Sequence, residues 1–342
     1  MSKQSIFKIL KFVGSLSLSA VIIYFLFKNQ DPVKLLQEIQ MVDGKWVFFS
    51  MVFGSWAIVN RGLRWIVLID ALGYTSSKWN SVSAVAFSYF TNLFLPRAGE
   101  ISRCTALNQA ERIPVDKLFG TIIVERVIDF IFLFVLIFLT MIFKFNDIFN
   151  FYLKISSQKN GSFNSNNIIQ FATILLAFIL IVIITKKYLQ KTSFYVKIQE
   201  FISGIKIGFK SIKNIKNKSS FWFHTFSIWI MYFLMTDICF FCMEETSNLT
   251  AGDGLFLLVL GGIGMVIPTP GGIGSYHAIM MIGLSVLGVG TIYLGEGGDP
   301  SNPALLFPTI VHIAQTLVAL ITGSIGLLIL FLSKKKTNVT SN

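Results

Sequence analysis

Long unbroken apolar runs are the feature that most restricts what this chain can fold into. A helix needs about 20 apolar residues to cross the roughly 30 Å hydrocarbon core of a bilayer. Of the 342 residues, 54% are hydrophobic and only 13% are charged, which excludes an ordinary soluble domain. The sequence therefore predicts an all-α multi-pass membrane protein. Six runs are long enough to be full spans: residues 6–27, 46–72, 118–143, 168–185, 221–243 and 304–332.

The first run has lysines at its start, as a signal peptide would. The polar residues 28–31 follow it without a small-x-small cleavage site, so we interpret it as a retained first span. The three cysteines, Cys104, Cys239 and Cys242, cannot form a closed set of disulfides and have no cluster of metal ligands around them. We expect no metal and no cofactor. The three histidines, His224, His277 and His312, are dispersed and are interpreted as packing or interface residues.

Positive charge gathers in two places along the chain. Residues 186–218 contain nine lysines against one glutamate, Glu200, and Lys334, Lys335 and Lys336 come just before the C-terminus. In a membrane protein such clusters mark the cytoplasmic side, so the net charge of +12 does not indicate nucleic acid as a partner. The lysine-rich segment is either a solvated loop or an amphipathic helix on the anionic inner leaflet.

Placing both termini and the lysine-rich segment in the cytoplasm fixes the direction of every span. The chain is then a single membrane domain over residues 1–342. We divide it into a first span and outer loop (1–45), a first repeat (46–143), a linker span with the basic loop (144–220), a second repeat (221–332) and a cytoplasmic tail (333–342).

Two further apolar stretches are each interrupted by proline and glycine. They cover residues 82–114 and 255–288. Irregular backbone at membrane depth persists only where protein buries it or where it lines a polar cavity. We therefore expect two re-entrant hairpins. The alternative is two short complete spans in each stretch, which gives ten crossings and the same placement of the termini.

The two hairpins resemble each other in sequence. Aligning "LFLPRAGEISRCTAL" with "MVIPTPGGIGSYHAI" pairs Pro96 with Pro268 and Gly99 with Gly271, in each case 172 positions apart. The first hairpin would enter from the cytoplasm and the second from outside. This is the arrangement of an inverted-topology repeat, in which broken helices meet near the midplane of the membrane and form a substrate site.

Charged residues cluster at the first break. Pro96 can start a half-helix whose N-terminal N–H groups carry partial positive charge, and Arg97 and Arg103 add full charges, so this end would attract an anion. Glu100 lies three residues from each arginine, so an ion-pair ladder on one helical face is the alternative.

Charges also interrupt two of the predicted spans. Glu125, Arg126 and Asp129 lie in "VERVID", where each charge at the centre of a span costs about 2.5 to 3.5 kcal/mol. Glu125 and Asp129 share one face and need a cationic partner, either Arg126 or an arginine of another helix. Arg61 and Arg64 in "NRGLRW" would either bind a phosphate or pair with protein carboxylates.

Three motifs follow one another along the chain. The first, in "NLFLPRAGEISR", is carried by Asn92, Pro96, Gly99 and Glu100, and the second by Glu125, Arg126 and Asp129. The third is carried by Pro268, Pro270, Gly271, Gly272 and Gly274. In this order, and over nearly the whole chain, they resemble the membrane domain of lysylphosphatidylglycerol synthases, the flippase-like family. Where the family usually has a glutamate shortly after these glycines, this chain has Ser275, Tyr276 and His277.

The resemblance implies movement of a lipid or a lipid-linked head group between leaflets, without the soluble aminoacyl-transferase domain. We expect a translocator in the plasma (inner) membrane rather than an enzyme, with membrane lipids as partners and an anionic head group at the site. Whether it forms a homo-oligomer stays open. The alternatives are an enzyme that transfers a glycosyl or aminoacyl group to a lipid carrier, and an accessory membrane subunit. The expected site comprises Arg61, Arg64, Asn92, Arg97, Gly99, Glu100, Arg103, Glu125, Arg126, Asp129, Pro268, Pro270, Gly271, Gly272 and Gly274.

Overall fold

The computed structural model describes residues 3–158, 215–292 and 302–339, and every regular element in these ranges is helical. This confirms the predicted all-α class. The elements are α1 (Lys3–Phe27), α2 (Pro32–Met41), α3 (Gly44–Ala71), α4 (Lys78–Phe94), α5 (Gly99–Glu111), α6 (Val115–Phe143), α7 (Phe145–Gln158), α10 (Lys218–Asp237), η1 (Ile238–Cys242), η2 (Glu244–Thr246), α11 (Ala251–Val266), η3 (Pro270–Gly272), α12 (Ser275–Val286) and α13 (Pro303–Val339).

Three helical segments of the described chain are long and apolar enough to cross a membrane: Gly44–Ala71, Lys218–Cys242 and Pro303–Ser333. A fourth is counted if Phe12–Phe27 and Pro32–Met41, which meet at 86°, form one broken span. The predicted run 118–143 falls in α6 and contains three charged residues. The predicted span 168–185 and most of the lysine-rich segment lie outside the described residues. The count of six full spans therefore stays a prediction.

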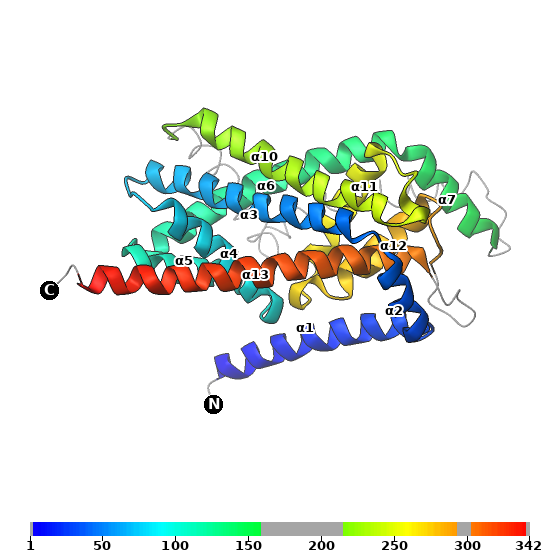
Figure 1. The fold of residues 1–342 in the computed structure, drawn as a ribbon, viewed down its shortest axis with the longest axis horizontal. Helices are drawn as coiled ribbons and strands as arrows, with labels where there is room; N and C mark the ends of the chain where they lie inside the picture. Colours follow the sequence, from blue (N-terminus) through cyan, green and yellow to red (C-terminus); the bar gives the residue numbers. More distant parts are fainter. Residues whose placement is uncertain (1–2, 159–214, 293–301, 340–342) are drawn as a thin grey trace, which may run out of the picture.

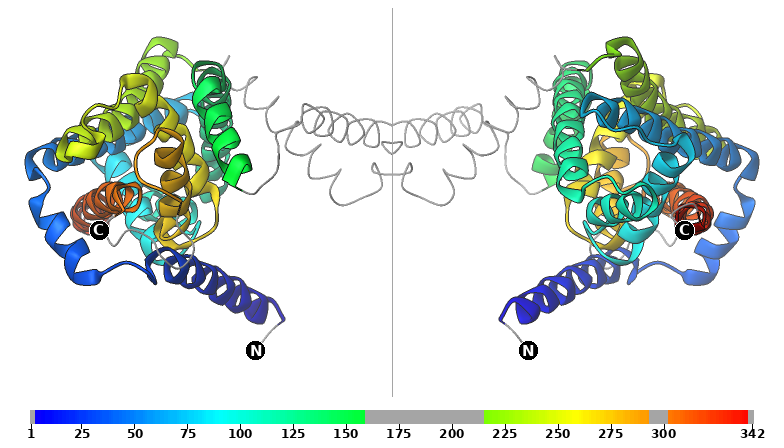
Figure 2. Two further views of the ribbon diagram at one scale, coloured as in Figure 1. Left: turned by 90° about the vertical axis from the view of Figure 1, so that its right-hand side faces the viewer. Right: turned by 90° about the vertical axis from the view of Figure 1, so that its left-hand side faces the viewer.

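The long helices α3, α6, α10 and α13 run along a common axis, and the free ends of α1 and α13 point toward the same end of the molecule (Figure 1). Helix α13 packs closely on α4 through small residues. A Cβ built on Gly326 would lie 2.7 Å from the backbone oxygen of Ser83, so only glycine permits this approach. Helix α1 stands off the bundle (Figure 2) and touches it at the second hairpin, where the Ser19 hydroxyl donates to the Ile273 carbonyl at 2.8 Å.

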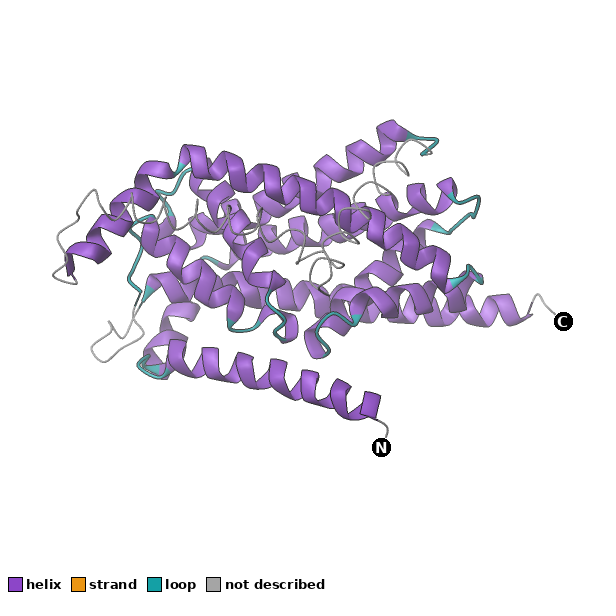
Figure 3. Cartoon of the chain, turned by 180° about the vertical axis from the view of Figure 1, so that it is seen from behind, coloured by secondary structure: helices purple, strands orange, loops and turns teal. Residues whose placement is uncertain are grey.

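Both interrupted stretches form helical hairpins. Helices α4 and α5 form the first, and α11, η3 and α12 form the second; the four α-helices have 12 to 17 residues. Helices this short fall below the roughly 20 residues of a full span. The hairpins come from opposite ends of the bundle, and their turns meet near its middle (Figure 1, Figure 3).

The start of the second helix in the first hairpin differs from the prediction. Pro96 does not begin it: α4 ends at Phe94, residues 95–98 form the turn, and α5 begins at Gly99. The turn reverses the chain with Arg97 at φ 62°, a left-handed conformation that is uncommon outside glycine. Proline therefore terminates the first helix here, and glycine opens the second.

Replacing Gly62 by alanine should destabilise the packing of α3 against α4. A Cβ at this position would lie 2.6 Å from the Val82 Cα, which is backbone and cannot rotate away. Overpacking of this kind costs about 1–3 kcal/mol, so the thermal unfolding midpoint of the purified protein should fall. Gly120→Ala in α6 is the matched control because its Cβ would meet nothing within 4 Å. Equal midpoints for the two variants would contradict this packing.

Candidate functional site

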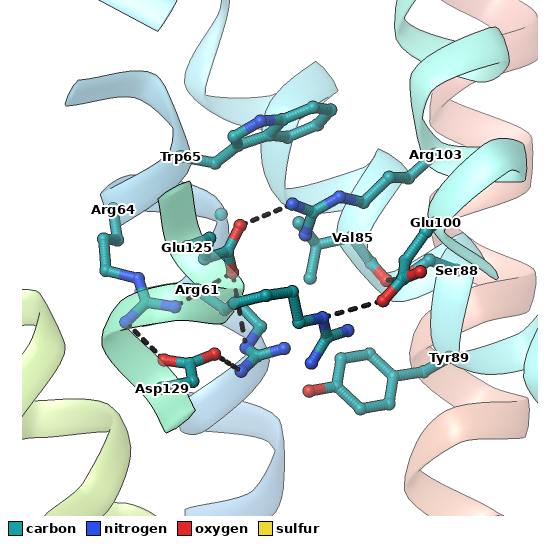
Figure 4. Close-up of polar contacts among 12 residues, drawn as sticks. Arg61, Arg64, Trp65, Val85, Ser88, Tyr89, Glu100, Arg103, Glu125 and Asp129 are labelled. Carbon is teal, nitrogen blue, oxygen red and sulfur yellow. Dashed lines mark hydrogen bonds and ion pairs between the residues drawn. The ribbon is translucent and has the colours of Figure 1, made fainter. Parts of the chain in front are cut away.

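A buried charge cluster joins three helices at the level of the hairpin turns. Arg61 and Arg64 come from α3, Arg103 from α5, and Glu125 and Asp129 from α6. Arg64 bridges both carboxylates, at 3.0 Å to Glu125 Oε1 and 2.8 Å to Asp129 Oδ1. Arg61 donates to Asp129 and Arg103 to Glu125 (Figure 4).

Helical spacing on α3 and α6 explains why the cluster can form. Arg61 and Arg64 are three residues apart and Glu125 and Asp129 four apart, so each pair projects from one face of its helix. The two faces oppose each other, and each carboxylate faces more than one guanidinium. The predicted need for a cationic partner is confirmed, with Arg61, Arg64 and Arg103 as the partners. Arg61 and Arg64 thus pair with protein carboxylates.

Aromatic and hydroxyl side chains hold Arg103 in place. Its guanidinium carbon lies 4.4 Å from the ring centre of Trp65, and the indole N–H of Trp65 donates to the Thr121 hydroxyl at 2.7 Å. A guanidinium stacked on an aromatic face gains cation–π attraction in addition to its ion pair. Because Arg103 is buried and paired with Glu125, it does not form the alternative ion-pair ladder with Glu100.

The cluster carries more positive than negative charge. Three arginines face two carboxylates, and the Nε atoms of Arg61, Arg64 and Arg103 are buried without a hydrogen-bond partner within the described part of the chain. Unpaired buried charge is costly, so a further anion nearby would stabilise this arrangement.

A second, more exposed ion pair lies beside the cluster. Arg126 Nε donates to Glu100 Oε1 at 2.7 Å, and the side chain of Arg126 is 50% exposed. Glu100 belongs to the first turn of α5, next to Gly99, whose N–H donates to Asn92 Oδ1 at 2.8 Å. A Cβ on Gly99 would lie 2.6 Å from the Asn92 side chain, so glycine allows this helix to start against α4.

The turns of the two hairpins contact each other directly. Arg97 Nη2 donates to the Val266 carbonyl at 3.0 Å, which joins the first turn to the end of α11. In the second turn, Gly271, Gly272 and Gly274 all have positive φ values, between 58° and 88°. These conformations favour glycine and allow the chain to reverse between Pro268 and α12.

A cavity of about 410 Å³ lies between the two turns. It is lined by Asn92, Pro96, Arg97 and Glu100 of the first hairpin, by Arg126 of α6, and by residues 265–269 with Gly271 and Gly272 of the second hairpin. The lining carries two arginines, Arg97 and Arg126, and one carboxylate, Glu100, which is a surplus of one positive charge. The cavity therefore suits a small anionic group.

Comparison with known proteins agrees with these motifs. The family model for the lysylphosphatidylglycerol synthase TM region matches residues 12–323. The chain belongs to this family. A UPF0104 membrane protein of Methanocaldococcus jannaschii is 24% identical over 321 residues, which cover 87% of this chain and 88% of that protein. No solved structure matches the chain.

Within this lysylphosphatidylglycerol synthase TM region, the predicted site residues divide into three groups. Seven of them line the cavity: Asn92, Arg97, Glu100, Arg126, Pro268, Gly271 and Gly272. Arg61, Arg64, Arg103, Glu125 and Asp129 form the buried cluster instead, and Gly99, Pro270 and Gly274 shape the turns. Their roles in binding a substrate stay a prediction.

Sequence reasoning missed several polar residues around the buried charge cluster. Trp65 and Thr121 support Arg103, and the Tyr89 and Tyr232 hydroxyls form a 2.8 Å hydrogen bond between α4 and α10. Trp65 is the last residue of "NRGLRW", but its indole is not part of the predicted site. The sequence shows only that each of these residues has a polar atom within an apolar helix. Such an atom requires a hydrogen-bond partner when it is buried, but the sequence does not identify the partner.

Proposed function

We propose that this protein moves a lipid with an anionic head group between the leaflets of the plasma (inner) membrane. The supporting observation is the 410 Å³ cavity at the meeting point of the two hairpin turns, with its surplus of positive charge. Arg97 and Arg126 are the cavity arginines with exposed guanidinium groups, and both could form charge-assisted hydrogen bonds to a phosphate. The substrate could be an anionic or aminoacylated phospholipid, or a polyprenyl-linked lipid.

A second, apolar groove supports the proposal that the substrate has hydrocarbon chains. It has a volume of about 470 Å³ and is lined only by apolar and aromatic residues of α6, α10 and α11. On α11, Leu258 lines this groove and Met265 lines the charged cavity; they are seven positions apart and therefore lie on one face of the helix. A head group in the charged cavity could thus have a chain in this groove. The remaining chains would stay in the bilayer.

The transport mechanism that we propose is alternating exposure. Six full spans, both termini in the cytoplasm and an inverted repeat of the two hairpins form its framework. Such a repeat requires two turns that approach from opposite ends and meet at the substrate site. The two hairpin turns do approach from opposite ends, and a charged cavity lies between them. Rocking of the two halves would expose the cavity to one leaflet and then to the other.

Reconstitution into liposomes tests this function. Labelled anionic, zwitterionic, aminoacylated and polyprenyl-phosphate lipids would each be scored for movement between leaflets. We expect movement of one class and at least a 10-fold loss in Arg126→Ala, since a hydrogen bond to a charged group contributes about 1.5–3 kcal/mol. Arg112→Ala is the matched control because Arg112 is an exposed arginine at the end of α5, outside the cavity lining.

Two results would count against transport by this site. A fully active Arg126→Ala variant would remove Arg126 from the mechanism. If no lipid class moves although the protein is folded, the enzyme or accessory-subunit alternative would become the better interpretation. Folding of each variant would be checked by its thermal unfolding midpoint.

A further inference from the structure

Two histidines that are far apart in the sequence meet behind the turn of the second hairpin. His277 is the third residue of α12, and His312 lies in α13. Their ring centres are 4.9 Å apart, and both side chains are almost fully buried, with 4% and 6% of their surface exposed. The pairing could not be predicted from the sequence because the two residues are separated by 35 positions.

Three of the four ring nitrogens have no hydrogen-bond partner among the described residues. These atoms are Nδ1 of His277 and both Nδ1 and Nε2 of His312. Buried polar atoms in folded proteins almost always have a partner, so three such atoms in one place require an explanation.

The surroundings supply no charge for a protonated ring. The Tyr276 ring of α12 lies 5.4 Å from His312, and the Phe27 ring of α1 lies 6.3 Å from His277. The titratable neighbours are Tyr276 and, from η1, Cys239 close to Tyr276. Neither histidine forms an ion pair with a described carboxylate, so a charged imidazolium would be both buried and unpaired in this conformation.

The histidine pair is separated from the charged cavity only by the hairpin turn. Gly272 lines the cavity, and a Cβ built on it would lie 3.8 Å from His312 Cε1. The turn is held by the Ser19–Ile273 hydrogen bond and by a 2.7 Å bond between the Thr269 and Ser275 hydroxyls. Movement of this turn away from α13 would bring water to the two rings.

We propose that His277 and His312 form a proton-binding site that controls the position of the second hairpin turn. In this structure the pair is neutral and covered. When the turn moves, one imidazole nitrogen takes a proton from water, and the other ring accepts a hydrogen bond from the resulting N–H. Because the proton binds only to the uncovered form, acid shifts the population toward that form, by up to about tenfold per pH unit. A link between this proton and lipid movement rests on the proposed function.

A distance measurement between the two hairpins tests the proton site without any transport assay. Ile101 at the start of α5 and Ile273 in the second turn are both exposed, so cysteines at these positions would accept spin labels. The native cysteines are buried. In nanodiscs, we expect the label-to-label distance to shift to a longer population between pH 8 and about pH 5, across the usual range of histidine. Added His277→Gln and His312→Gln substitutions should abolish this shift.

His224→Gln is the matched control because His224 lies on α10 and its Nδ1 is hydrogen-bonded to the Asn60 side chain at 2.8 Å. This control should keep the acid shift. The proposal would be overturned if the label-to-label distance did not change with pH in the labelled protein that keeps both histidines. It would also be overturned if the acid shift remained after both histidines were replaced. A shift produced by Zn²⁺ at pH 8, and not by acid, would make the pair a metal site and overturn it as well. An acid shift in protein that moves no lipid would support the proton site while counting against the proposed function.

Discussion

Glu125→Ala is expected to leave little folded protein. The substitution removes the carboxylate that faces Arg61, Arg64 and Arg103, and it leaves three buried arginines with Asp129 alone. Breaking a buried ion pair from one side costs about 3–5 kcal/mol, a large part of the roughly 5–15 kcal/mol that stabilises a typical domain. The measurement is the yield of monodisperse protein in detergent, together with its thermal unfolding midpoint.

A double variant distinguishes two possible causes of the instability of Glu125→Ala: unpaired buried charge, and the cavity left by the lost side chain. Adding Arg103→Met to Glu125→Ala restores the original surplus of one positive charge and keeps an apolar side chain against Trp65. If unpaired charge causes the instability, the double variant should be more stable than Glu125→Ala alone. If the cause is the cavity left by the glutamate, methionine in place of arginine cannot fill it, so the double variant should be no more stable than Glu125→Ala, and this outcome would contradict the charge-pairing explanation.

Cross-linking the two hairpin turns should stop lipid movement completely. A Cβ on Gly271 would lie 3.6 Å from the Leu93 Cα, so Leu93→Cys with Gly271→Cys places two thiols within reach of a disulfide. Alternating exposure requires the turns to separate. We expect the oxidised double variant to be inactive and a reductant to restore movement, measured on the same liposomes.

The reduced double variant and each single variant are the controls for this cross-link. Gly271 has a φ of 58°, so a cysteine there is strained and lowers stability even without a disulfide. The three native cysteines are buried and should not form competing cross-links. Normal transport by the fully cross-linked protein would show that the turns do not need to separate.

The sequence by itself determined the class of the protein and the places where its helices break. Long apolar runs predicted the helical membrane class, which the structure confirms. Proline and glycine located both hairpin turns, although the second helix begins at Gly99 and not at Pro96. These features are local: they depend on the neighbours of each residue along the chain and on the thickness of a bilayer.

Helical periodicity also placed Arg61 with Arg64, and Glu125 with Asp129, on shared faces. It could not choose their partners. The sequence predicted that Arg97 and Arg103 together attract an anion, whereas the structure buries Arg103 against Glu125 and leaves Arg97 at the cavity with Arg126.

Only the tertiary structure decided which residues of different helices meet. The rotation of each helix about its axis and its shift along a neighbour are set by packing of side chains such as Trp65 and of close contacts at Gly62 and Gly326. The same packing brings His277 to His312 and the turn at Arg97 to Val266. Because contacts between distant segments depend on all of these interfaces at once, periodicity fixes the face on which a charge lies, and packing fixes what it meets.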